Sequence, residues 1–109
     1  MNQRYDRRRA ARIPTRFVAV YSAQRTEGTG MLKNVSRTGA LIETKQVVRS
    51  LGAAVRAEVV VGDDHRVSVS GTVARFDESG FGVHFDGVSA ELLELLHALG
   101  VGDEDTGVR

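Results

Sequence analysis

Apolar and polar residues alternate along the middle of the chain. In residues 55–61 the odd-numbered positions are apolar, whereas Arg56 and Glu58 occupy polar positions between them. This period of two is typical of a strand with one face buried and one face in water. Five further segments have a similar pattern or a strand-like composition: residues 16–21, 31–35, 40–43, 66–73 and 81–85. We therefore predict about six strands.

Short polar segments connect several of the predicted strands. Residues 62–64 (GDD) and 77–80 (DESG) are rich in Gly, Asp and Ser. These residue types stabilise tight reversals of the backbone, so both segments are predicted to be hairpin turns. Strands joined by such short turns pair in antiparallel fashion. The predicted fold class is therefore all-β, as an antiparallel barrel or sandwich.

One helix is predicted after the last strand. Ser89 is suited to be its N-cap, and Gly100 is suited to end it. Between them the leucines recur at helical spacing, at positions Leu92, Leu93, Leu95, Leu96 and Leu99. Such a stripe is typical of a helix that covers a barrel mouth or a sheet face. The stripe is wider than one packing face requires, so a partner-binding helix is the alternative.

Length and composition restrict the possible functions. The chain has 109 residues and a mass of 11.8 kDa, which suits one domain. It has no cysteine, which excludes disulfides, cysteine-ligated metal sites and thiol catalysis. His65, His84 and His97 lack the spacing of metal ligands, and no nucleophile–base pair is evident. We expect neither an enzyme nor a metal or cofactor site.

No segment has the character of a membrane span or an export signal. The chain has no apolar run of the roughly 18 residues that a transmembrane helix needs. The basic N-terminal stretch is not followed by the apolar core of a secretory signal. We therefore expect a cytoplasmic protein that does not insert into membranes.

Charge is unevenly distributed, although the formal net charge is only +1. The first 16 residues hold one acid, Asp6, and six arginines: Arg4, Arg7, Arg8, Arg9, Arg12 and Arg16. From Asp63 onward there are ten acidic and three basic residues. Residues 1–12 lack hydrophobic periodicity, so we expect a flexible arginine-rich segment there. Residues 13–100 are then the folded domain, and residues 101–109 a disordered acidic tail.

Two polar motifs are candidates for a ligand site. Residues 7–12 contain four arginines, whose guanidinium groups bind phosphate or the O6/N7 edge of guanine bidentately. Asn34 and Ser36 lie two positions apart in an extended segment, so their side chains are expected on one side. Gly39 permits a positive φ and close approach of the backbone to a ligand. From the residues alone, charge favours a solvated tail for the first motif, and a plain turn explains the second motif as well as a ligand site does.

Together these motifs resemble the signature of the PilZ family, whose members are receptors for the bacterial messenger cyclic di-GMP. That signature is RxxxR followed further along the chain by (D/N)xSxxG. Residues 8–12 (RRAAR) resemble its first part and residues 34–39 (NVSRTG) its second part, with Asn34 where Asp is commoner. Residues 13–14 (IP) and 80–85 (GFGVHF) also resemble the family. The resemblance implies a six-stranded antiparallel PilZ-type β-barrel with a C-terminal α-helix.

The resemblance also implies roles for the arginines. Arg8 and Arg12 would contact the phosphates and the Hoogsteen edge of one guanine, and Arg9 would assist them. Arg7 lies directly before the first motif, and in this it resembles family members that bind the ligand as an intercalated dimer. Some relatives carry a Trp on the strand that faces the ligand. This chain has no Trp, and Arg75 is the candidate extra contact in the comparable strand.

The same resemblance implies roles for the residues of the second motif and a way in which ligand binding is signalled. Asn34 and Ser36 would read the edge of the other guanine, and Gly39 would shape the loop. Binding would order the N-terminal segment and change its position relative to the barrel. As a stand-alone domain, the protein would pass this signal to an unidentified partner protein.

Two other functions stay open. A PilZ-like adaptor could act without any nucleotide and dock on partners through its leucine-rich helix. A small barrel could instead bind RNA or single-stranded DNA through the basic segment. Such proteins use aromatic stacking platforms and a strongly basic surface. With 6% aromatic residues and a net charge of +1, the chain does not favour a nucleic-acid partner.

Overall fold

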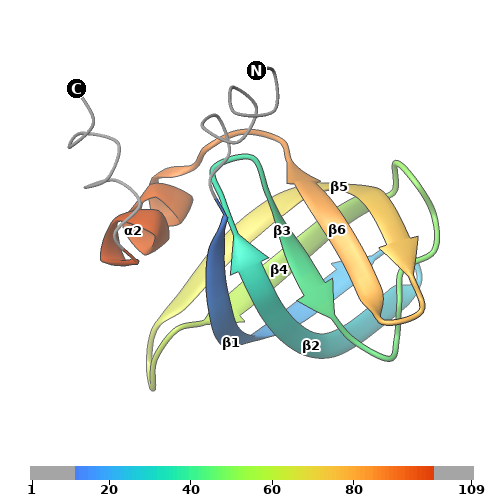
Figure 1. Ribbon diagram of the computed structural model, residues 1–109, viewed down its shortest axis with the longest axis horizontal. Coiled ribbons are helices and arrows are strands. Elements are labelled where there is room, and N and C mark those ends of the chain that lie inside the picture. The colour runs from blue at the N-terminus through green and yellow to red at the C-terminus, as the bar shows by residue number, and fades with distance from the viewer. Residues whose placement is uncertain (1–11, 100–109) are drawn as a thin grey trace, which may run out of the picture.

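The computed structural model of the protein describes residues 12–99, and six strands form a closed antiparallel barrel there (Figure 1). The strands pair in the order β1-β2-β3-β6-β5-β4, and β4 closes the barrel against β1. Their bounds are β1 Ile13–Ala23, β2 Thr26–Val35, β3 Gly39–Glu43, β4 Ala54–Val60, β5 Arg66–Asp77 and β6 Gly80–Phe85. The helix α2 follows at Ala90–Ala98. The prediction of a six-stranded barrel with a C-terminal helix is confirmed, and the sandwich is excluded.

Both predicted hairpin turns are present, but several strands are longer than predicted. β4 and β5 are joined through residues 62–64, and β5 and β6 through residues 78–79. The hairpin of β1 and β2 extends to a turn at Gln24, whose φ of 52° is in the left-handed region. Residues 26–30 (TEGTG) had no strand pattern because glycines occupy their inward positions. Apolar alternation cannot reveal a strand whose buried positions carry no side chain.

Two inward glycines of β2 make room for neighbouring groups. A Cβ atom on Gly28 would lie 2.5 Å from the Tyr21 hydroxyl, and one on Gly30 would lie 2.5 Å from the Glu43 carbonyl oxygen. The buried Tyr21 hydroxyl is hydrogen-bonded to Thr44 Oγ1 at 2.8 Å and donates to the Gln46 carbonyl oxygen. The glycines therefore permit a close approach of strands and a satisfied tyrosine inside the barrel.

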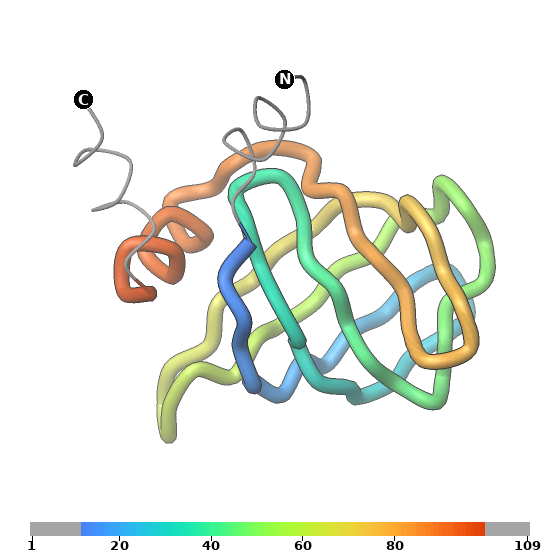
Figure 2. The backbone as a smooth tube through the Cα atoms, in the orientation of Figure 1, coloured from blue at the N-terminus to red at the C-terminus, as the bar shows by residue number. Residues whose placement is uncertain are grey.

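The core fills the barrel between two covered ends. In its interior the ring of Tyr21 packs edge-on against that of Phe81, with 5.0 Å between the ring centroids. The connection from β3 to β4 crosses one end of the barrel, where Val48 and Ala53 are buried (Figure 2, green). The helix α2 lies at the other end and packs against β5 (Figure 1). The connection between β3 and β4 thus covers one end of the barrel, and the helix that follows the last strand covers the other.

The helix begins as predicted, at an N-cap formed by Ser89. Its hydroxyl accepts a 3.0 Å hydrogen bond from the backbone N–H of Leu92. Three leucines of the stripe are buried, whereas Leu93 is 50% exposed. The predicted stop at Gly100 lies outside the described residues. In residues 12–99 no helix is long and apolar enough to cross a membrane.

Candidate functional site

The two sequence motifs meet where β1 begins and β2 ends. Arg12 directly precedes β1, and the pairing of Pro14 with Asn34 brings the start of β1 beside the end of β2. Arg12 Nη1 donates a 2.7 Å hydrogen bond to Asn34 Oδ1, and both groups are at the surface. The two residues are 22 positions apart in the sequence. This bond joins the last arginine of the first motif to the first residue of the second.

Ser36 stabilises the loop between β2 and β3 from the inside. Its side chain is fully buried, and its Oγ accepts hydrogen bonds from the backbone N–H groups of Thr38 and Gly39, both at 3.2 Å. Its own N–H donates to the Gly39 carbonyl oxygen at 2.8 Å. The structure differs here from the expected projection of Asn34 and Ser36 to one side. β2 ends at Val35, so the strand alternation no longer applies at Ser36.

Gly39 begins β3 and lies tightly against β6. It pairs with His84, and a Cβ atom at Gly39 would lie 2.3 Å from the carbonyl oxygen of Val83. The close approach in the structure is to a strand of the same barrel, whereas a close approach to a ligand stays a prediction. The expected positive φ is absent, because Gly52 is the only glycine with a positive φ in the described part of the chain.

A shallow depression of about 80 Å³ extends from this corner across β3, β6 and β5. Arg12, Gly39, Arg75 and His84 line it together with neighbouring backbone. Arg75 on β5 pairs with Gly82 on β6, and its side chain lies over that glycine. A Cβ atom on Gly82 would lie 3.2 Å from Arg75 Cγ. The missing side chain therefore lets the Arg75 guanidinium lie along the sheet surface.

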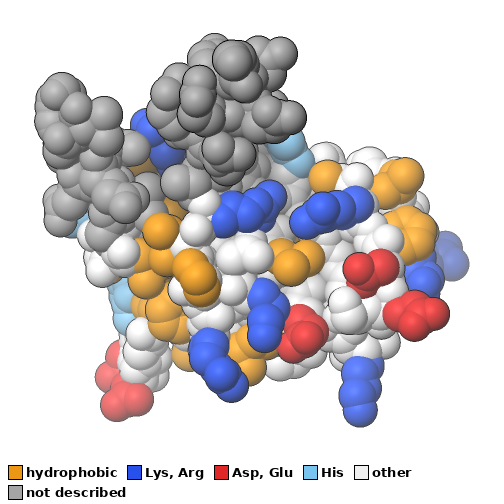
Figure 3. Space-filling model, viewed as in Figure 1, with side chains coloured by type: hydrophobic (Ala, Val, Ile, Leu, Met, Phe, Trp, Pro, Cys, Tyr) orange, Lys and Arg blue, Asp and Glu red, His pale blue; other side chains and the backbone are white. Residues whose placement is uncertain are grey.

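The structure thus brings together Arg12, Asn34, Gly39 and Arg75 from the predicted set, whereas the Ser36 side chain is turned away. Arg7, Arg8 and Arg9 lie outside the described residues. Figure 3 shows Lys and Arg side chains spread over the face that carries β2, β3 and β6, with Asp and Glu lower on it or to its right. This face is therefore suited to an anionic ligand.

Among the residues with polar side chains that line this depression, sequence reasoning missed two, Thr38 and His84. A signal for His84 was available, because it is the polar position between the apolar Val83 and Phe85 in β6. His65, His84 and His97, which lack the spacing of metal ligands in the sequence, are all exposed. Residues 12–99 contain no group of three His, Asp or Glu side chains that could hold a metal.

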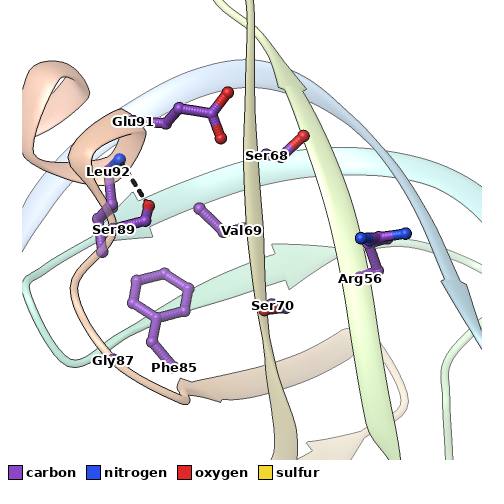
Figure 4. Close-up of a pocket in the computed structure, with 9 residues that line it drawn as sticks. All are labelled: Arg56, Ser68, Val69, Ser70, Phe85, Gly87, Ser89, Glu91 and Leu92. Carbon is purple, nitrogen blue, oxygen red and sulfur yellow. Dashed lines mark hydrogen bonds between the residues drawn. The ribbon is translucent and has the colours of Figure 1, made fainter.

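A separate hollow of about 220 Å³ lies between α2 and the outer side of β5 (Figure 4). Phe85 and Val69 line it between helix and strand, and Arg56 stands on the far side. The dashed line in Figure 4 is the N-cap bond from the Leu92 N–H to Ser89. None of the candidate ligand residues lines this hollow, which follows the seam where the helix packs on the barrel.

Comparisons with known proteins agree with this geometry. The family model described as the PilZ domain matches residues 6–99. Among solved structures, the chain is similar to the Bacillus subtilis inhibitor of motility (MotI/DgrA), with a TM-score of 0.69 and 16% sequence identity. The match covers 94% of this chain and 53% of that chain, so this chain spans about half its length. At this identity the likeness shows the fold alone. No curated protein matches the sequence.

Proposed function

This chain belongs to the PilZ domain family, and on that premise we propose that it is a receptor for cyclic di-GMP. The family consists of domains that bind this messenger and act as adaptors, not as enzymes. The observation that carries the proposal is the 2.7 Å hydrogen bond from Arg12 Nη1 to Asn34 Oδ1. It makes one composite surface out of two motifs that the family uses for the ligand.

Arg12 is the described member of the proposed arginine clamp. A guanidinium group has five N–H donors, and in residues 12–99 only one bond, to Asn34, engages those of Arg12. Phosphate oxygens or the O6/N7 edge of a guanine can accept from the others. Arg8 acts in the same way, Arg9 assists, and Arg7 contacts a second ligand molecule of an intercalated dimer.

Asn34 and the loop that follows it form the barrel side of the proposed site. Asn34 is partly exposed at the end of β2, so its amide group can reach a guanine edge while its oxygen orients Arg12. Ser36 and Gly39 act through the loop, which they hold in the shape that presents Asn34. Arg75 offers a flat cation over Gly82, on which a second guanine can stack.

The proposed output is a movement of residues 1–12. Ligand binding orders this segment against the barrel, and the gain in contacts must exceed the lost conformational entropy. The changed position of the segment is then recognised by a partner protein in the cytoplasm. This output needs no catalytic group and no cofactor other than the ligand.

Calorimetric titration of the full chain with cyclic di-GMP tests the proposal. We expect saturable binding with one or two ligand molecules per chain. The Arg12→Ala variant should lose about 100-fold in affinity, because hydrogen bonds to charged groups contribute about 3 kcal/mol. The matched control is Arg25→Ala, which removes an exposed arginine at the opposite end of β1 and should bind normally.

Two outcomes would contradict the proposal. If the wild-type chain gives no binding heat, and no chemical-shift changes with cyclic di-GMP, it is not a receptor for this ligand. The nucleotide-independent adaptor would then be the better description. If Arg12→Ala and Arg25→Ala both bind normally, the ligand lies elsewhere on the barrel.

A further inference from the structure

An apolar patch lies on the outer face of β1, away from the proposed nucleotide site. Val18 and Val20 point outward from this strand and are 43% and 41% exposed. Val18 pairs with Val60 on β4 and with Met31 on β2, and both of these are half-buried. Isolated apolar side chains are normal on a surface, but four adjacent ones on three strands indicate a contact surface.

The rows next to this patch are polar and contain charges of opposite sign. Val20 pairs with Glu58 on β4 and with Thr29 on β2. In the following row, Ser22 pairs with Arg56 on β4 and with Glu27 on β2. All six of these residues line a hollow on the barrel surface with a volume of about 460 Å³. The apolar patch therefore adjoins a hollow that begins at Val20 and is flanked, one row further on, by one cation and one anion.

The two charges at that end have no partner within the described part of the chain. Arg56 and Glu27 make no ion pair or hydrogen bond between side chains in residues 12–99, whereas Glu58 pairs with Arg66 at 3.2 Å. Neighbouring strands are about 4.8 Å apart, so two strand spacings separate Arg56 from Glu27 across Ser22 by about 10 Å. Each charge is therefore placed to pair with a group on another molecule.

We propose that this face binds a second copy of the chain in a symmetric dimer. A two-fold axis parallel to β1 places each row of side chains over its own copy. Val60 then lies over the partner subunit's Met31, and Glu58 over the partner subunit's Thr29. Arg56 lies over the partner subunit's Glu27, and the symmetry forms this ion pair twice. Ser22, which is small, lies at the axis between the two ion pairs.

The alternative two-fold arrangement is unfavourable. An axis perpendicular to β1 would place the Val60 row over the Glu58 row and bury a carboxylate against an apolar side chain. The parallel arrangement places apolar over apolar in the Val18 row, Glu58 over Thr29 in the Val20 row, and cation over anion in the Ser22 row. Two sheets can stack in this way at about 10 Å, with the usual twist of about −30° between their strands. Because the pattern of side chains on this face is complementary to itself, we infer that the face binds a second copy of this chain.

Sedimentation velocity of the full chain over a concentration series tests the dimer. We expect the mass to rise from 11.8 kDa to about twice that value as concentration increases. Val20→Lys should keep the chain monomeric, because the two-fold axis along β1 places position 20 over its own copy and two like charges would then meet. The matched control is Leu51→Lys, since Leu51 is 66% exposed and lies in the connection between β3 and β4. This control should dimerise like the wild type.

A charge exchange tests the predicted pairing and keeps all substitutions at exposed positions. Glu27→Arg alone and Arg56→Glu alone should each weaken dimerisation by about tenfold or more, because each places like charges opposite one another. The double variant should regain the wild-type affinity. A wild-type chain that stays monomeric at every concentration overturns the proposal, as does a dimer that tolerates Val20→Lys. If Val20→Lys fails to fold by circular dichroism, the charge exchange alone decides.

Discussion

Ser36 and Asp77 each stabilise a turn by accepting hydrogen bonds from the backbone N–H groups two and three residues further along the chain. Ser36 does this in the loop between β2 and β3. Asp77 Oδ1 accepts from the N–H groups of Ser79 at 2.8 Å and Gly80 at 3.2 Å. Such side-chain bonds replace the backbone partners that a tight turn leaves unpaired. The Ser36 side chain is buried and neutral, whereas the Asp77 side chain is exposed and carries a charge.

Asp77→Asn tests this charge at the residue scale. The hydrogen bonds from Ser79, first from its hydroxyl and then from its N–H, lower the pKa of Asp77 below its ordinary value of 3.8. The ionised form thus stabilises the fold above about pH 4, and this contribution is lost as the pH falls through the lowered pKa. In urea unfolding, wild type should be more stable than Asp77→Asn at pH 7, and the difference should disappear in strong acid.

Glu78→Gln is the control for the pH experiment. It removes a carboxylate from the same turn without removing any of the Asp77 hydrogen bonds. The difference in stability between wild type and Asp77→Asn should disappear in acid. The difference between wild type and Glu78→Gln should not change with pH in this way. Equal pH profiles for the two variants would mean that the Asp77 turn contributes no specific charge effect.

At the scale of elements, the long hairpin of β1 and β2 depends on positions that carry no side chain. Gly28 and Gly30 face inward in β2, where Tyr21 and the backbone of β3 occupy the space. Glycine weakens an isolated strand through its conformational entropy. In this barrel the cost is offset, because a larger residue would separate β2 from β3 or displace the tyrosine. The strand is therefore a product of packing, not of local propensity.

Gly30→Ala tests the packing of β2. The new Cβ atom would lie 2.5 Å from the Glu43 carbonyl oxygen and 2.9 Å from Thr44 Cβ. We expect chemical denaturation to show a loss of about 1–3 kcal/mol, the usual cost of overpacking. The matched control is Gly62→Ala, because a Cβ there meets only His65 Cβ at 3.8 Å. The control should change stability by less than about 0.5 kcal/mol, and equal losses in both variants would contradict this account.

At the scale of the whole molecule, closure of the barrel assembles the candidate site. Arg12 precedes β1, Asn34 lies in β2, Gly39 starts β3 and Arg75 lies in β5. The order β1-β2-β3-β6-β5 places these segments around one part of the surface. Within residues 12–99, the fully buried core side chains lie between positions 19 and 96. We therefore expect folding to depend on the barrel, whereas the proposed ligand binding needs both the barrel surface and residues 1–12.

Removal of residues 1–11 tests this separation. The shortened chain should keep the circular dichroism spectrum and unfolding midpoint of the full chain, because the described core is retained. Its affinity for cyclic di-GMP should fall by about 100-fold or more, since Arg7, Arg8 and Arg9 are removed together. Unchanged affinity would exclude the segment from the site. Capture of a partner protein by the shortened chain without nucleotide would favour the adaptor function.

Several features follow from the sequence by itself. The strands β3, β4 and β6, both predicted turns and the Ser89 cap depend on local patterns, namely alternation, turn residues and capping side chains. The two motifs and their order also predicted the family that the comparisons show. Local conformational preferences act between near neighbours, so they can be read from a short window of sequence.

Other features were decided only by the tertiary structure. The full length of β1 and β2, the inward direction of Ser36 and the meeting of Arg12 with Asn34 depend on strand pairing and register. The placement of Arg75 over Gly82 depends on the pairing of β5 with β6. Pairing is selected by the packing of residues far apart in the chain, and a shift of one residue would reverse every side chain. Local periodicity does not reveal which strands pair or in which register. Closure of the barrel therefore determined which polar groups share one surface.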